Sequence, residues 1–100
     1  MDDAPDYLGQ AEKLCSYFRK VRDGLSQDDQ AHWDRAMRMC ERWIRLIGSR
    51  ELTEDAIESY LDDIYREPHP GSGWCELSYQ FKQWAWYRGF AARDRTYAKP

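Results

Sequence analysis

Residues 26–48, SQDDQAHWDRAMRMCERWIRLIG, form the stretch around which the rest of the chain is expected to pack, because one side of it needs apolar partners. At about 100° per residue, the period of an α-helix, apolar and charged residues separate onto opposite faces. The apolar face is formed by Trp33, Ala36, Met37, Cys40, Trp43, Ile44 and Ile47. The opposite face carries the arginine row, which consists of Arg35, Arg38, Arg42 and Arg45. We therefore expect a helix that packs through one side and presents guanidinium groups on the other.

The arginine row has two interpretations from sequence. Asp34 precedes Arg38 by four residues, and Glu41 precedes Arg45 by four. This is the favourable order for helical ion pairs, each worth roughly 0.2–0.5 kcal/mol. Such a face is usually only solvated, yet two acids cannot neutralise four arginines. A plain surface and an anion-binding surface both stay open at this point.

Two helices are expected in the first half of the chain. Residues 6–23 carry apolar side chains at helical spacing, and Gly24 is expected to end that helix. Ser26 is the expected N-cap of the helix over 27–47, which Gly48 ends.

Two more helices are expected in the second half, over 54–66 and 74–88. Thr53 is the expected cap of the first, whose outer surface is acidic. That surface comprises Glu54, Asp55, Glu58, Asp62, Asp63 and Glu67. A loop with two prolines and two glycines over 67–73 leads to the last helix, which Gly89 closes. The inward side of the last helix is Trp74, Leu77, Phe81, Trp84 and Ala85, and the other side is Tyr79, Lys82, Gln83, Trp86 and Tyr87.

The helical pattern predicts an all-α protein, because no alternating strand pattern occurs in the sequence. We expect a compact four-helix orthogonal bundle forming a single domain over 1–100, with residues 90–100 as a linker or frayed end. No apolar run is long enough to cross a membrane, and the acidic N-terminus lacks a signal-peptide pattern. We therefore expect a cytoplasmic protein without a membrane partner.

The sequence offers little for catalysis or metal binding. The three cysteines, Cys15, Cys40 and Cys75, have no metal-ligand spacing and are all expected to be small buried residues. His32 and His69 have no nucleophile or carboxylate arranged around them, and His69 is expected in a loop. We expect no metal, no cofactor and no catalytic activity in this chain, which leaves recognition of nucleic acid or protein.

The net charge of −3 does not exclude a basic face. Residues 51–67 carry one base against seven acids, whereas residues 25–50 carry five bases against four acids and residues 68–100 carry five against two. The acidity is thus concentrated in the third helix, which phosphate would repel. The second and fourth helices remain available to an anionic partner.

The order of these segments resembles the N-terminal core-binding (SAM-like) domain of tyrosine recombinases, the phage and integron-type integrases. HWDRAMRMCERWIRLIG, ELTEDAIESYLDDI and SGWCELSYQFKQWAWYRG are similar to successive helices of that domain, and PDYLGQAEKLCSYFRKVRDGLS is similar to an extra leading helix of the integron-type members. The resemblance covers roughly residues 5–90.

The resemblance implies that this chain is one jaw of a clamp around double-stranded DNA, with a role in DNA integration and recombination. A separate C-terminal catalytic domain of the same parent chain would supply the catalytic residues. The chain would then be an N-terminal fragment of a longer integrase, or a degenerate remnant that binds without cleaving.

The second and fourth helices match the helices that cross the major groove in that family. The implied phosphate anchors are Arg35, Arg38, Arg42 and Lys82, with weaker help from Arg45 and Arg19. Tyr79 and Gln83 are the candidates for hydrogen bonds to base edges or backbone. The alternative is a helical protein-interaction module that uses Trp86 and Tyr87 or the acidic third helix.

Overall fold

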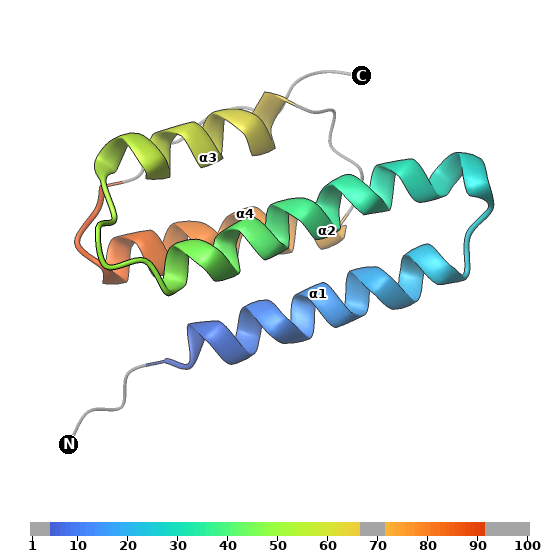
Figure 1. The fold of residues 1–100 in the computed structure, drawn as a ribbon, viewed down its shortest axis with the longest axis horizontal. Coiled ribbons are helices and arrows are strands. Elements are labelled where there is room, and N and C mark those ends of the chain that lie inside the picture. Colours follow the sequence, from blue (N-terminus) through green and yellow to red (C-terminus); the bar gives the residue numbers. More distant parts are fainter. Residues whose placement is uncertain (1–4, 67–71, 92–100) are drawn as a thin grey trace. The chain divides into compact units, whose positions relative to one another are not determined.

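The protein is all-α in the part of the chain that the structure, a computed structural model, describes: residues 5–66 and 72–91. Within these ranges it contains four helices and no strand, which confirms the predicted class (Figure 1). The chain divides into two compact units, residues 1–49 and 50–100. The single domain and the orthogonal SAM-like arrangement stay predictions.

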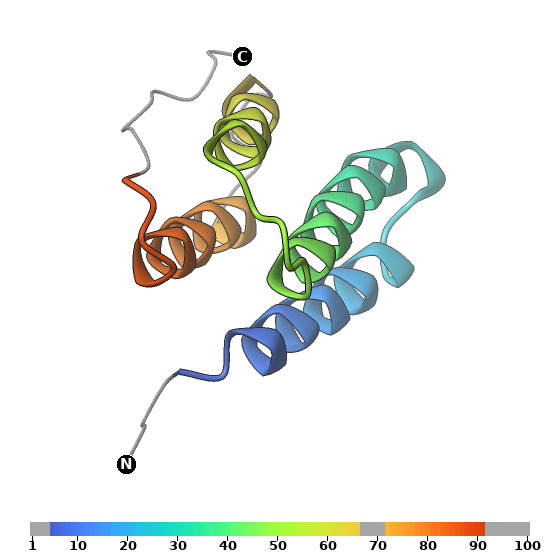
Figure 2. The ribbon, with the colours of Figure 1, turned by 60° about the vertical axis from the view of Figure 1, so that its left-hand side comes forward.

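The first unit is a hairpin of α1 (Tyr7–Asp23) and α2 (Gln27–Ile47), which lie side by side and run in opposite directions (Figures 1 and 2). Its core joins Phe18 of α1 to Trp33 of α2, with ring centroids 5.6 Å apart. Farther from the turn that joins the two helices, the Cys40 thiol donates a hydrogen bond to the backbone carbonyl of Ala11 at 3.1 Å. Trp33 and Cys40 of the predicted apolar face of α2 therefore pack on α1.

The second unit contains α3 (Glu54–Arg66) and α4 (Ser72–Tyr87), which run in opposite directions (Figure 1). Tyr60 of α3 stacks on Phe81 of α4 with ring centroids 3.9 Å apart and planes only 15° apart. The indole Nε1 of Trp74 donates a hydrogen bond to the Ile64 carbonyl at 2.9 Å. This bond gives a buried polar group a partner and fixes the first turn of α4 against the end of α3.

The helix ends confirm most of the predicted boundaries. Asp6 caps α1 by accepting a hydrogen bond from the Gly9 amide at 2.9 Å, and Thr53 caps α3 by accepting one from the Ala56 amide at 3.2 Å. Ser26 precedes α2 as predicted, but its hydroxyl donates to the Asp29 carboxylate at 3.1 Å and caps no backbone amide.

The start of α4 differs from the prediction, because Ser72 and Gly73 belong to the helix and not to the loop. The two added residues precede Trp74, whose buried indole bonds to the Ile64 carbonyl, so the first turn of α4 is the turn that holds this contact. The rest of the predicted loop, with His69, and positions 92–100 of the predicted tail lie outside the described residues.

Burial differs from the sequence prediction at several positions. Cys15 and Cys40 are buried as predicted, whereas Cys75 is exposed on the outer side of α4. Met39 and Ser78 are buried, although neither was placed on an inward face. Met39 lies at the edge of the apolar arc of α2, and the Ser78 hydroxyl is satisfied by donating to the Cys75 carbonyl at 3.0 Å.

Candidate nucleic-acid interface

The arginine row lies on α2, on the side away from the buried residues of that helix. Arg35, Arg38 and Arg45 are exposed, while Arg42 is half-buried. Arg42 follows the buried Met39 by three residues, so both lie at the same edge of the helix. Arg35 and Arg42 also interact with other residues of the chain.

The acidic residues of α2 do not neutralise the arginine row as the helical spacing predicts. The Asp34 carboxylate accepts a hydrogen bond from Nη1 of Arg22 on α1 at 3.0 Å, so its partner belongs to the other helix of the hairpin. Hydrogen bonds to Asp34 and to Asp23 raise the pKa of Arg22. The predicted pair between Asp34 and Arg38 is therefore wrong, because Arg22 takes Asp34 instead.

Glu41, the other acid in the middle of α2, lines a hollow between α1 and α2 together with Cys15 and Ile44. It forms no ion pair with Arg45 within residues 5–66 and 72–91, so the second predicted pair is also wrong.

Arg38 and Arg45 consequently have no ion-pair partner among the residues that the structure describes. They are seven residues apart, two turns of helix or about 10 Å along the axis. Two exposed guanidinium groups on one side of a helix, with Asp34 and Glu41 facing α1, form a cationic surface. Its chemistry suits phosphate, which arginine binds through paired N–H donors.

Arg19 occupies a different environment. It is exposed on α1 but lines the same hollow as Glu12 and Glu41. The two carboxylates reduce the positive potential around Arg19, so it is a weaker phosphate anchor than Arg38 or Arg45.

On α4, Tyr79 and Gln83 form a pair. The Gln83 side-chain amide donates a hydrogen bond to the Tyr79 hydroxyl at 2.8 Å, and both side chains are exposed. The structure thus brings together the two residues predicted to contact base edges or backbone. Each still has hydrogen-bonding capacity left: the Tyr79 hydroxyl proton, and the carbonyl oxygen and second amide proton of Gln83.

Lys82 is directed toward α3. Its ammonium group lies 5.8 Å from the centroid of the Tyr65 ring, a cation–π contact, and the side chain is half-buried. Lys82 also takes part in a further interaction. This residue therefore contributes to packing in the second unit, and its predicted role as a phosphate anchor stays a prediction.

Trp86 was placed only in the alternative function, and it has the most exposed large ring of the described residues, at 77%. It lies in the last turn of α4, which ends in a Schellman motif. In that motif the Gly89 amide donates to the Trp86 carbonyl and the Phe90 amide to the Ala85 carbonyl, both at 2.9 Å. The helical spacing predicts this exposure, because it places Trp86 on the side of the helix opposite the inward residues Leu77 and Phe81.

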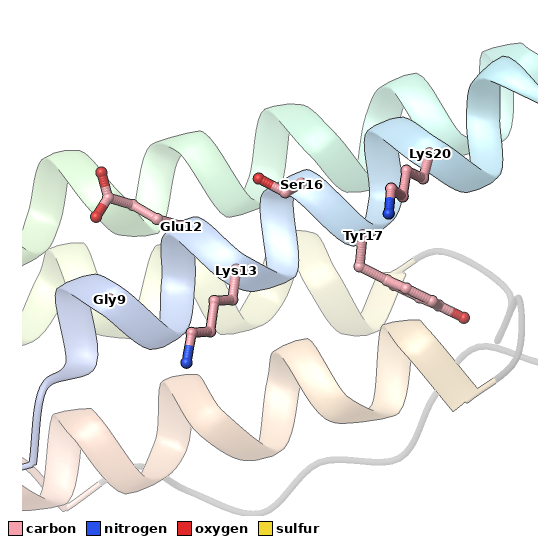
Figure 3. A pocket seen from close by; sticks show the side chains of 6 residues that line it. All are labelled: Gly9, Glu12, Lys13, Ser16, Tyr17 and Lys20. Carbon is pink, nitrogen blue, oxygen red and sulfur yellow. The ribbon is translucent and has the colours of Figure 1, made fainter.

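A further hollow lies on the outer surface of α1 (Figure 3). It is lined by Gly9, Glu12, Lys13, Ser16, Tyr17 and Lys20. Lys13 and Lys20 are seven residues apart, as Arg38 and Arg45 are, so they provide a matched pair of exposed cations on the other helix of the same unit.

Other kinds of site find no support within the described ranges. No cluster of three or more His, Cys, Asp or Glu side chains there could hold a metal ion. None of the helices in those ranges combines the length and the apolar character needed to span a bilayer. No protein-family model, curated protein or solved structure matches this chain.

Proposed function

We propose that this chain binds double-stranded DNA through the arginine row of α2, as a non-catalytic, cytoplasmic DNA-contacting domain of a tyrosine recombinase or integrase. The observation that carries the proposal is the exposure of Arg38 and Arg45 without ion-pair partners among the described residues. The order of helices and the Thr53 cap are in keeping with the resemblance to the core-binding domain.

The physical basis is electrostatic. Duplex DNA carries one negative charge per roughly 1.7 Å of axis, and each phosphate that a cation neutralises releases condensed counterions. Two arginines about 10 Å apart along α2 can reach different phosphates of one duplex. Such contacts hold the protein on DNA without reading sequence, which is left to groups that reach base edges, such as Tyr79 and Gln83 on α4.

The test is a titration of fluorescently labelled duplex DNA at low salt with three proteins. The double variant Arg38→Ala/Arg45→Ala should bind roughly tenfold or more weakly than the wild type. The double variant Lys13→Ala/Lys20→Ala removes the same charge at the same spacing on α1 and should bind nearly as well as the wild type. Equal losses in the two variants would show a dependence on total charge and would contradict a site on α2.

A further inference from the structure

The outer side of α4 carries a row of exposed side chains that the binding of DNA backbone by α2 does not use. Tyr79, Gln83 and Trp86, here called the α4 strip, are spaced by four and three residues and so share one side of the helix. Tyr79 is 56% exposed and Trp86 is 77% exposed. Exposed aromatic rings offer flat apolar faces of the kind on which nucleobases stack.

The middle of the α4 strip is polar, and this favours a nucleobase over a protein groove as its partner. A helix that docks into a protein groove uses apolar anchors at spacings of three, four and seven residues. Here the central position is Gln83, whose carbonyl oxygen accepts no hydrogen bond from residues 5–66 or 72–91. A protein groove would bury this oxygen at a cost, whereas a nucleobase offers both a flat ring for Trp86 and a polar edge for Gln83.

The positive charge beside the α4 strip also suits nucleic acid. Lys82 directly precedes Gln83 in α4, and its ammonium group lies 5.8 Å from the centroid of the Tyr65 ring of α3. Glu76, the one acidic residue of α4, accepts a hydrogen bond from Gln80 at 2.7 Å.

We propose that the α4 strip binds unpaired bases of DNA, with Trp86 as the stacking platform and Gln83 as the group that bonds to the base edge. Bases inside a duplex are already stacked on one another, so only unpaired bases can use the ring. The hydrogen bond between Gln83 and Tyr79 holds the strip in one arrangement before the ligand arrives. This inference rests on the proposed DNA-binding function and adds a ligand class: duplex DNA that carries unpaired bases.

The test compares one duplex with flush ends and the same duplex with a short single-stranded thymine overhang. The wild type should prefer the overhang by about 5- to 150-fold for each stacked base. Trp86→Ala should lose this preference while keeping its affinity for the flush duplex, and Trp86→Phe should keep most of the preference. Tyr87→Ala, an exposed aromatic on the same helix but outside the strip, is the matched control and should keep the preference. Circular dichroism confirms that each variant is folded.

The outcomes distinguish a failure of the α4 strip as a binding site for unpaired bases from a failure of DNA binding by α2. A flush duplex bound through Arg38 and Arg45, with no preference for the overhang, overturns the role of the α4 strip and leaves the proposed function standing. If Trp86→Ala binds both DNAs as the wild type does, the strip serves another class of ligand, such as a protein, and the inference fails. If no DNA binds at low salt, the proposed function fails together with it.

Discussion

Replacing Gly89 by alanine should destabilise the protein by about 1–2 kcal/mol, because the backbone there is left-handed. Gly89 has φ +95°, a conformation that an L-residue with a side chain rarely adopts. An added Cβ would meet no atom within 4 Å, so the loss would come from backbone strain alone and not from a collision. For a domain of this size, each 1 kcal/mol corresponds to a melting temperature lower by about 4–8 °C.

Gly24→Ala is the matched control, since Gly24 also follows the last residue of a helix. Its φ is −90°, and the nearest atom to an added Cβ is the Val21 carbonyl oxygen at an ordinary 3.7 Å. Alanine fits this conformation and narrows the unfolded ensemble, so the variant should gain about 0.4–1 kcal/mol. Urea denaturation followed by circular dichroism measures both free energies of unfolding. A Gly89→Ala variant as stable as Gly24→Ala would refute the assignment of the Schellman motif.

Further predictions concern the cores of the two units. Burial, with a smaller effect of Cys15, raises the pKa of Cys40 to about 12, so at pH 8 only about one Cys40 thiol in 10⁴ is ionised. Iodoacetamide should therefore modify the exposed Cys75 first and leave Cys40 unmodified. Mass spectrometry of the treated protein measures both modifications. In the unfolded chain the Cys40 thiol has a lower pKa, near 9. The stability that the neutral buried thiol contributes is therefore complete below pH 9 and is lost as the pH rises toward 12. Because Cys40→Ala has no thiol to ionise, this variant should lose less stability over the same pH range. In the second unit, Phe81→Ala should cost about 3–5 kcal/mol, and a double-mutant cycle with Tyr60→Ala should give a coupling of about 0.5–1.5 kcal/mol for the stacked rings. A coupling near zero would contradict that stacking.

The helices could be predicted from sequence because each one carries its signals locally. The apolar period of α2, the Thr53 cap of α3 and the Gly89 end of α4 depend only on residues a few positions apart. Such short-range patterns survive whatever the helices pack against.

The partners of charged side chains could not be predicted in the same way. The spacing of four residues pairs Asp34 with Arg38 within α2, but Arg22 lies twelve residues away in sequence and competes for the carboxylate through the packing of α1 on α2. Lys82 similarly contacts Tyr65 of another helix. Cys75 follows the buried Trp74 directly, and one step of about 100° around the helix is enough to place it outside.

Binding of DNA phosphates by the arginine row of α2 is tested by the salt dependence of the affinity. The dissociation constant for one duplex is measured over a range of salt concentrations for the wild type and for Arg38→Ala/Arg45→Ala. The slope of log K against log salt should be smaller in the variant by about two units, one for each lost phosphate contact. Equal slopes in the two proteins, or no binding at low salt, would contradict it.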